Sequence, residues 1–492
     1  MVCGCVSLVC WVLVLLATSA LTLQPPVEDL SVADERSEEV VVVVVVPSAL
    51  LQVVEGTNHT LTWYCDLPSV TSVTASVHDQ VVGAVVSVGE VVAGSRTDNF
   101  TYTGNITVSA LFIGYNKIYV TLYDDLQVVV GRSVVDMSVL LSYQQLTDLF
   151  TLIIGILVSI VYVTMGATLD FQVIKRIFKR PVGPAVGIIC QYVFMPLIAF
   201  GVSLVAFPGN PLGQLGLFLA GCCPGGGASN LWTHLLGGSL DLSIIMTFVS
   251  SVFAFATVPT WVFLLGRVIM GDSHFVIPYK DIALLVVSLS LPCFVGILIQ
   301  RFLPRVGKVL SRLLTPLAVF NVIFLFTFGV YANRYIFSLF DVKVVVAGLG
   351  LPTLGYLSGL ILASALSLPL QDVIAISIET GIQNISVAIF ILKFSLEKPA
   401  GDITAAFPAA AVVMTPVPLV VALLVRRLYL CRRSNKSLHL QHLHKDTPEG
   451  GSQAQNPTNE AKVLPQATDK NIATSPEGGV DNPAVDLRVE TM

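Results

Sequence analysis

The chain has 492 residues, of which 54% are hydrophobic and only 12% charged, and its mean hydropathy is +0.80. Ordinary soluble domains carry roughly a quarter of charged residues, so this chain has too few polar residues to cover a water-exposed globule of its size. Most of the chain is therefore expected in a lipid bilayer. Acidic residues outnumber basic ones by 32 to 27, which excludes a broad basic face for nucleic acid.

An apolar run from Val6 to Leu23 occupies the N-terminus and ends in small residues at 17–20. This ending is typical of a signal-peptidase site, and Pro25 and Pro26 then stop any helix. No basic residue precedes the run, so an N-terminal anchor is the alternative to a signal peptide over residues 1–23. Either interpretation exports the residues that follow.

Residues 24–145 have a different pattern, in which Val and Thr alternate with polar residues between short stretches of Gly, Asn and Asp. This period of two, interrupted about every ten residues, predicts an exported domain like a β-sandwich. The valines at 40–46 favour a buried strand. Cys65 is the only cysteine of the region, so no disulfide framework is expected. Three sequons indicate glycosylation, at Asn58, Asn99 and Asn105.

From residue 149 onward, apolar segments of bilayer-spanning length alternate with short polar joints. They predict about nine transmembrane helices within a domain over residues 146–428, at 149–168, 182–207, 211–236, 240–265, 282–299, 313–331, 344–368, 373–392 and 405–425. Basic residues concentrate in the first and fifth joints and after the last span, which predicts that these parts are cytoplasmic. The N-terminal domain then lies outside, at the plasma membrane or in an internal membrane of the secretory pathway.

The last segment, residues 429–492, is rich in Pro, Gly, Asn, Gln and Glu, which predicts a disordered cytoplasmic tail. His439, His442 and His444 have no cysteine or carboxylate partner at ligand spacing. We therefore expect no transition-metal site in the tail.

Glu379 is the only charged residue well inside any predicted span. A carboxylate at bilayer depth costs several kcal/mol unless it is paired or meets a cation, so it marks a functional site. Its neighbourhood, SIETGIQN, places a glycine, Gln383 and Asn384 in mid-span. A helix broken there would offer backbone carbonyls that, with Glu379 and Gln383, form a cage of hard oxygens suited to Na⁺. A protonated Glu379 that bonds a neighbouring helix is the alternative.

The third predicted span contains GCCPGGGASN, from Gly221 to Asn230. A proline followed by three glycines does not hold a straight helix, and irregular backbone at this depth is tolerated only inside protein or beside a water-filled cavity. Close packing of small residues is the alternative, but it leaves Ser229 and Asn230 unexplained. The stretch 227–230 shares the form Gly-x-polar-Asn with 381–384, as expected for inverted repeats that place two breaks at one midplane site.

Three more polar residues are candidates for the same site. Ser243 and Thr247 are four residues apart and therefore share a helix face, and Gln191 is a mid-span amide. Such residues also bond their own backbone in many membrane helices. An enzyme is not expected, because Ser229 and His234 turn to different faces of one helix and the sequence contains no HExxH or phosphate-loop motif.

The motifs MGATLDF, CQYVFMPL, GCCPGGGASN and IETGIQN occur in an order that resembles the sodium/bile acid cotransporter family, solute carrier family 10. The resemblance covers about residues 149–425, and the long exported domain resembles the orphan members of that family. It implies a core domain with two crossed, broken helices that moves against a panel domain, with two Na⁺ ions as the coupling ions and no other cofactor.

Carried over by residue, the resemblance implies two sodium sites that share Glu379. The first uses Ser229, Asn230, Ser243 and Thr247, and the second uses Gln191 and Gln383 with backbone carbonyls near Thr380 and Ile382. Gly227 and Asn384 would border the substrate cavity. Gly227 stands where the bile acid carriers have threonine, which leaves the sodium cage intact but changes the substrate surface.

The sequence thus predicts a polytopic all-α membrane protein that moves an organic anion, such as a bile acid or steroid conjugate, together with Na⁺. Its partners would be these small molecules and the lipid bilayer, with no nucleic acid. The competing hypothesis is an orphan membrane receptor or interaction protein that keeps a transporter-like body and acts through its exported β-domain.

Overall fold

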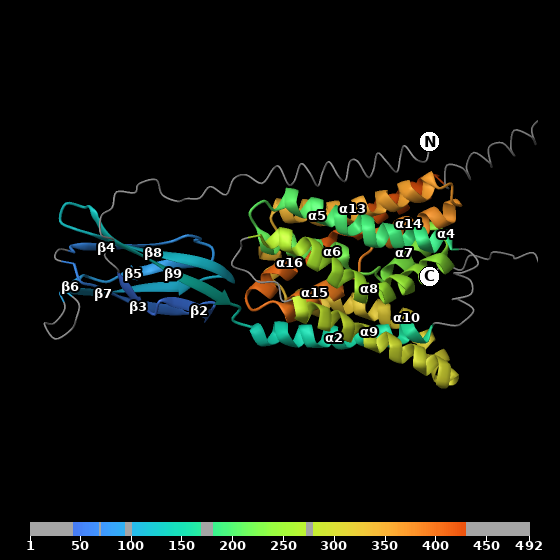
Figure 1. Ribbon diagram of the computed structural model, residues 1–492, viewed down its shortest axis with the longest axis horizontal. Helices are drawn as coiled ribbons and strands as arrows, with labels where there is room; N and C mark the ends of the chain where they lie inside the picture. Colours follow the sequence, from blue (N-terminus) through green and yellow to red (C-terminus); the bar gives the residue numbers. More distant parts are fainter. Residues whose placement is uncertain (1–42, 68–69, 94–100, 169–180, 272–278, 430–492) are drawn as a thin grey trace, which may run out of the picture. The chain divides into compact units, whose positions relative to one another are not determined.

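The computed structural model describes residues 43–67, 70–93, 101–168, 181–271 and 279–429 (Figure 1). Several predictions fall outside these residues: the N-terminal signal or anchor, the sequon at Asn99, the first basic joint and the C-terminal tail. The β-rich part and the helical part are taken in turn below.

The β-rich part consists of two sheets, as the alternating pattern predicts. One sheet has the order β1-β3-β7-β5, with β6 also paired to β7, and the other has the order β2-β9-β8-β4. The strands of the first sheet are β1 (Val44–Val46), β3 (Asn58–Cys65), β5 (Gly83–Val88), β6 (Val92–Ala93) and β7 (Tyr102–Ala110). Those of the second are β2 (Ala49–Val54), β4 (Ser72–Val77), β8 (Gly114–Tyr123) and β9 (Val129–Leu140).

The period of two explains how this part buries its own core. Along β3, Leu61, Trp63 and Cys65 are buried while the residues between them are more exposed, and Ile106 and Val108 of β7 repeat the pattern. Side chains at alternate positions of a strand face the same side of the sheet, so these residues meet in one apolar layer. The layer is the separate hydrophobic core of the β-rich part.

The valine run does not form a fully buried strand in the residues that the structure describes. Val45 is buried, but Val44 and Val46 are 39% and 52% exposed. The reason is that β1 is an edge strand, antiparallel to β3, so its side chains alternate between the core and the outside. Val40 to Val42 lie outside the described residues.

The helical part contains both long helices and short interrupted ones (Figure 1). Its first half comprises α2 (Gln144–Ala167), α4 (Val182–Ile189), the π-helix η1 (Cys190–Phe194), α5 (Met195–Ala206), α6 (Pro211–Cys222), α7 (Ala228–Leu236) and α8 (Leu240–Met270). Its second half comprises α9 (Tyr279–Phe302), α10 (Pro304–Phe324), η2 (Leu325–Gly329), α11 (Val330–Ala332), α12 (Tyr335–Ser338), α13 (Val342–Ala365), α14 (Leu370–Gly381), α15 (Ile385–Ser395) and α16 (Ala400–Met414).

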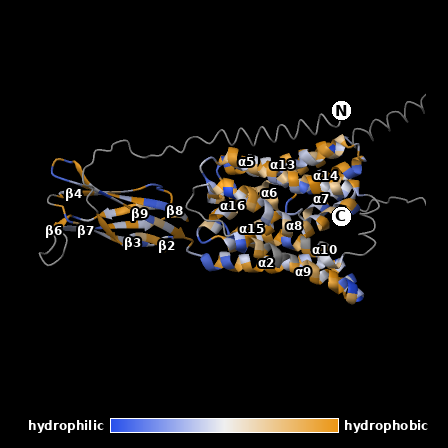
Figure 2. Ribbon diagram, viewed as in Figure 1, coloured by the Kyte–Doolittle hydropathy of each residue, from blue (hydrophilic) through white to orange (hydrophobic). Residues whose placement is uncertain are grey.

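Among the described residues, five helical segments are long and apolar enough to cross a bilayer: 144–167, 182–206, 240–270, 342–365 and 400–429. The bent pair 304–314 and 319–332 makes a sixth if it forms one span. Figure 2 shows that apolar residues dominate the helices. The chain is therefore a multi-pass membrane protein, while the count of nine spans and the inverted repeats stay predictions.

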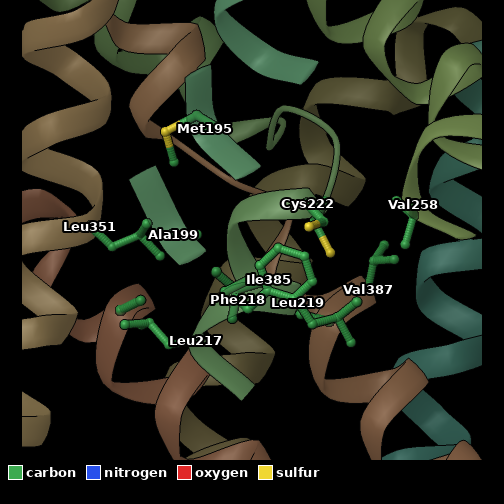
Figure 3. Packing of buried hydrophobic residues seen from close by; sticks show 14 of the residues in the cluster. Met195, Ala199, Leu217, Phe218, Leu219, Cys222, Val258, Leu351, Ile385 and Val387 are labelled. Carbon is green, nitrogen blue, oxygen red and sulfur yellow. The ribbon is translucent and has the colours of Figure 1, made fainter. Parts of the chain in front are cut away.

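The helices pack in two groups that meet around the centre of the helical part. The first group is α2, α9 and α10, which contact one another extensively. In the second group, α5 packs on α6, α13 on α14 and α16, and α15 on α16. Figure 3 shows the interior of the second group, where Phe218 and Leu219 of α6 lie with Ile385 of α15 in a single apolar cluster.

Candidate functional site

Two helical segments are interrupted near their middle, as the sequence predicts: α6 is followed by α7, and α14 by α15. The two interruptions, called breaks below, contact each other. Helix α6 ends at Cys222, just before Pro224, and α7 begins at Ala228; α14 ends at Gly381 and α15 begins at Ile385. Proline lacks the N–H that would continue a helix, and glycine loses the most conformational freedom when held in one. These residue types therefore explain where the helices stop.

Backbone hydrogen bonds replace the helical ones that are lost at the breaks. The N–H of Gly226 donates to the carbonyl of Ile382 over 2.8 Å, and the N–H of Asn384 donates to the carbonyl of Pro224 over 2.8 Å. Gly225 and Gln383 form an antiparallel bridge between the same segments. The two extended segments thus satisfy each other's backbone in the membrane interior, where an unpaired group is costly.

Close approach explains why glycine occupies this crossing. A Cβ atom on Gly225 would lie 2.3 Å from Oε1 of Glu379, and one on Gly226 would lie 2.8 Å from the carbonyl oxygen of Gln383. Both distances are shorter than real carbon–oxygen contacts, so a larger residue would push the segments apart. The glycines therefore let the backbone of one break reach the carboxylate beside the other.

Glu379 lies in the last turn of α14 and is 1% exposed. The Ser243 hydroxyl donates to Oε2 of Glu379 over 3.1 Å, and the Thr247 hydroxyl lies 2.6 Å from Oε1. Ser229 Oγ is 3.4 Å from Thr247 Oγ1. The one helix face predicted for Ser243 and Thr247 does point to Glu379. No basic side chain forms an ion pair with Glu379 in the part of the chain that the structure describes.

A second cluster of oxygens lies around Gln191, which projects from the π-helical turn η1. Gln191 Nε2 donates to the carbonyl of Cys223 and to Oε1 of Gln383, each over 2.8 Å. Gln383 Nε2 in turn donates to the carbonyl of Thr380 over 2.7 Å. Residues that are 192 positions apart in sequence are thus brought into one buried polar group.

Two amide oxygens at this site are buried and have no hydrogen-bond donor among the described residues: Oε1 of Gln191 and Oδ1 of Asn230. Leaving a buried acceptor unpaired costs about 1–3 kcal/mol. Together with a buried carboxylate that lacks a basic partner, these oxygens form a donor set that fits a hard monovalent cation.

Several groups of the predicted ligand set also form hydrogen bonds within the protein. The Ile382 carbonyl accepts the N–H of Gly226, so it serves the crossing itself, and the Thr380 hydroxyl donates to the carbonyl of Ile376 over 2.7 Å. Gln383 bonds Gln191 rather than Glu379. The structure therefore brings the predicted residues together as two adjacent clusters, with Glu379 hydrogen-bonded only in the first.

Two further residues belong to the site but do not stand out in the sequence. Thr233 donates its hydroxyl to Ser243 Oγ over 3.3 Å, and Ser250 accepts the N–H of Gly225 over 3.2 Å. Helical spacing is the signal that finds them. Thr233 is four residues after Ser229, and Ser250 is three residues after Thr247, so each shares a face with a predicted ligand.

A cavity of about 580 Å³ opens beside the two breaks. Polar groups at its inner end come from the site: Thr247, Asn230 and Asn384. Gly227 also lines it, at the N-terminus of α7. The remaining wall is mostly apolar and comes from α2, α7, α8 and α10, with Tyr162, Met165, Leu231, Trp232, Phe248, Val319 and Val322 among its residues.

Comparison with known proteins agrees with the motifs. Residues 155–338, which include the first break, match the family model described as the Sodium Bile acid symporter family. Over these residues the chain is similar to the sodium bile acid symporters. The resemblance inferred from the sequence motifs is thereby confirmed, and the coupling ion of this family is Na⁺.

Similar proteins extend the match beyond that domain. The human ileal sodium/bile acid cotransporter is 29% identical over 54% of this chain and 75% of its own length. The sodium-dependent organic anion transporter of Bos taurus is 29% identical over 52% of this chain and 67% of its own length. The human P3 protein is also 29% identical, over 52% of this chain and 54% of that protein. These symporter relatives are transporters and not enzymes.

The geometry also bears on a catalytic role for Ser229 with His234, and on the sequons. Ser229 is fully buried beside Thr247, whereas His234 is exposed and lines the cavity, so the two side chains do not meet. Asn58 and Asn105 are exposed on neighbouring strands β3 and β7, and Thr62 donates to Oδ1 of Asn105 over 3.0 Å. Exposure is compatible with glycosylation at both sites, which stays a prediction.

Proposed function

We propose that this protein is a Na⁺-coupled symporter of an organic anion and that its sodium ions bind at the crossing of the two breaks. The observation that carries this proposal is the buried carboxylate of Glu379, which is 1% exposed and has only hydroxyl partners in the described structure. A carboxylate held this way in a membrane protein calls for a cation.

The ligand sets follow from the two clusters. Glu379, Ser229, Ser243, Thr247 and the unpaired oxygen of Asn230 would hold one ion. The unpaired oxygen of Gln191, the oxygen of Gln383 and nearby backbone carbonyls at Thr380, Ile382 and Cys223 would hold the second, close enough to share the charge of Glu379.

The cavity supports an amphipathic substrate. Its volume of about 580 Å³ falls within the range of small-molecule sites, about 300–1,000 Å³. Its wall suits an apolar ring system, and a carboxylate or sulfate group at the inner end would lie near bound Na⁺ and the N-terminus of α7. The names of the similar cotransporter and anion transporter point to the same class, bile acids and other organic anions. Gly227 widens the cavity wall where the bile acid carriers would present a hydroxyl.

Coupling would follow from the order of binding. Ions at the crossing fix the two breaks relative to α8, and this stabilises the state that accepts substrate. The sodium gradient then drives uptake. The exported β-domain would lie outside and the C-terminus in the cytoplasm, as the distribution of basic residues predicts.

The test is uptake into proteoliposomes with an imposed Na⁺ gradient, using a bile acid and a sulfated steroid as probes. We expect uptake of at least one probe to require Na⁺, and Glu379→Gln and Gln383→Ala to abolish it while the protein still reconstitutes. Uptake at an unchanged rate in K⁺ medium, or in the Glu379→Gln variant, would show that the cage is wrong.

A further inference from the structure

A second buried polar cluster lies in the helical part, away from the proposed sodium sites. Its centre is an ion pair between Lys393 at the end of α15 and Asp402 at the start of α16, with 2.8 Å between Nζ and Oδ1. The two side chains are only 3% and 4% exposed. Lys393 is one residue beyond the predicted eighth span, and Asp402 precedes the ninth, so the sequence did not single them out.

The cluster joins the two packing groups of the helical part. Gln144, the first residue of α2, donates Nε2 to Oδ2 of Asp402 over 2.9 Å. Asn333, between α11 and α12, accepts from Lys393 Nζ over 2.7 Å, and the Tyr335 hydroxyl donates to the carbonyl of Asp402 over 3.1 Å. Each contact links α2 or the α11–α12 segment to α15 or α16. We call Gln144, Asn333, Lys393 and Asp402 the polar latch.

Aromatic side chains close the space next to the latch. Phe150, six residues after Gln144 on α2, is 2% exposed, and its ring centroid lies 6.0 Å from that of Phe324 and 6.4 Å from that of Phe328. Lys393 Nζ lies 6.0 Å from the centroid of Phe150. The latch and these aromatic rings lie next to each other near the N-terminal end of α2, and the cavity that Phe150 and Asn333 line between them holds only about 50 Å³.

The helical part has a large cavity at the opposite end, near the C-terminus of α2. The cavity beside the sodium sites is lined by Tyr162, Met165 and Thr168, at the C-terminal end of α2. Gln144 and Met165 are separated by about 30 Å along the helix, from a rise of 1.5 Å per residue. The large cavity thus lies at the C-terminal end of α2, whereas the latch lies at its N-terminal end.

An ion pair suits a contact that has to open. A buried pair is weak evidence for stability, because desolvation offsets most of its attraction, and apolar residues of similar size would hold the helices as well. When the two groups separate, water replaces the partners of Lys393 and Asp402, whereas separated apolar surfaces would gain nothing from water. Chemistry of this kind allows a tight closed state without a large penalty for the open one.

From this geometry we infer that the polar latch is a gate, which keeps the α2 N-terminal end closed while the cavity is open and separates when the cavity closes. The inference rests on the proposed transport function, since only a carrier with alternating access needs such a gate. Lys393 and Asp402 are then positioning residues that act on access and not on the ions themselves.

Cysteine accessibility tests this inference without an identified substrate. The protein is reconstituted in lipid nanodiscs, where both faces are exposed, and labelled with a membrane-impermeant maleimide. Ile154→Cys reports the closed side, because Ile154 is fully buried on α2 beyond Phe150, and Met165→Cys reports the cavity. Each is compared with the same protein lacking the new cysteine.

We expect Asp402→Asn to raise the labelling rate of the Ile154→Cys site about tenfold and to lower that of the Met165→Cys site, because opening one end closes the other. General loosening would raise both rates and would also expose Cys222, which is fully buried within α6. Gln144→Leu leaves the ion pair in place. It should change the two labelling rates in the same directions, but by only about two- to fourfold. Charge exchange, Lys393→Asp with Asp402→Lys, should restore protection.

A matched control exists at the same end of the helices. Lys398 and Asp148 form an exposed ion pair, 2.6 Å long, that also joins α2 to the segment before α16. Exposed pairs contribute little, so Lys398→Gln, which spares the contact between Asp148 and Gln144 of the latch, should leave both rates unchanged. Unchanged rates in Asp402→Asn, or equal increases at both sites, would overturn the gate. A Na⁺-induced rise in melting temperature, measured on the same nanodiscs, tests the proposed function separately. The labelling rates therefore test the gate, and the melting temperature tests the sodium sites.

Discussion

At the scale of single residues, the site depends on a few atoms that have no ordinary partner. Gln191 presents an unpaired Oε1, Asn230 an unpaired Oδ1, and Glu379 a carboxylate with two hydroxyl donors. A soluble protein would leave such groups to water, but here they are buried among membrane helices. Burying these groups without a partner is costly, and a bound cation would remove that cost. This is the physical basis of the sodium proposal.

Gln191→Leu tests the second ion site. The substitution keeps the volume of the side chain but removes Oε1 and the two hydrogen bonds to Cys223 and Gln383. We expect the apparent Na⁺ affinity to fall at least about tenfold, equivalent to about 1.4 kcal/mol. Na⁺ titration of the melting temperature measures this. Gln214→Leu is the matched control: Gln214 is also buried but donates to the carbonyl of Phe207, so its loss should reduce stability and leave the Na⁺ dependence intact.

Gly225→Ala tests the close approach at the crossing. Its new Cβ would meet Glu379 Oε1 at 2.3 Å, whereas the same methyl group at Gly350 meets nothing within 4 Å. We expect Gly225→Ala to weaken Na⁺ binding more than tenfold, and Gly350→Ala to behave as the unmodified protein. Equal Na⁺ affinities in both variants would mean that the carboxylate does not need the glycine backbone beside it.

How much of the site the sequence predicts depends on how local each signal is. Glu379 and the glycine-rich break stand out because they violate the rules of a membrane helix within a few residues. The pairing of Gln191 with Gln383 depends on helices that are far apart in sequence and required the structure. Lys393 and Asp402 were missed because a charge at the end of a span is ordinary in a sequence, and only packing shows that both are buried.

At the scale of elements, the helical hydrogen bonds stop at each of the two breaks. A short bridge between the two extended segments replaces them. Three contacts hold this bridge: the two backbone hydrogen bonds that join 224–226 to 382–384, and the Ser250 hydroxyl that accepts the N–H of Gly225. Helix α8 therefore supports the crossing with Ser250 and the proposed ion site with Ser243 and Thr247, all on one face. Ion binding and the shape of the crossing are linked through this helix.

Ser250→Ala tests the support from α8. Its loss leaves the Gly225 N–H unpaired, which costs about 1–3 kcal/mol of unfolding free energy, and it loosens the segment next to Glu379. Ser251→Ala removes a hydroxyl that bonds the carbonyl of Thr247 in its own helix and leaves the Gly225 N–H paired, so we expect a change below about 0.5 kcal/mol. Thermal melts of both variants in the absence of Na⁺ provide the comparison, and equal losses would contradict the role of Ser250.

At the scale of the whole molecule, the β-rich part and the helical part each have a hydrophobic core of their own. The sandwich pattern and the membrane helices were both predicted from periodicity, because each is a local regularity. The order of the strands, with β2 parallel to β9, is not predicted, since the pairing of strands far apart in sequence leaves no local signal. Nothing in the proposed sodium sites comes from the β-rich part.

Deletion of residues 24–140 behind a preserved N-terminus separates the transporter proposal from the receptor alternative. The deletion stops before α2, so Gln144 and its bond to Asp402 remain. We expect the shortened protein to keep its Na⁺-dependent stabilisation and Na⁺-linked flux. If it kept its fold but lost the Na⁺-dependent stabilisation and the flux, the β-rich part would be essential to the sodium sites. The proposal that the helical part transports by itself would then be wrong.

The most direct test of the central claim is the melting temperature of the purified protein as Na⁺ replaces K⁺ at constant ionic strength. A ligand that binds only the folded protein stabilises it by about 2.7 kcal/mol at 100 times its Kd, so we predict a melting temperature that rises with Na⁺ and saturates. Glu379→Gln should melt at one temperature in both salts. No difference between Na⁺ and K⁺ for the unmodified protein, or an undiminished Na⁺ effect in Glu379→Gln, would contradict a sodium site at the crossing.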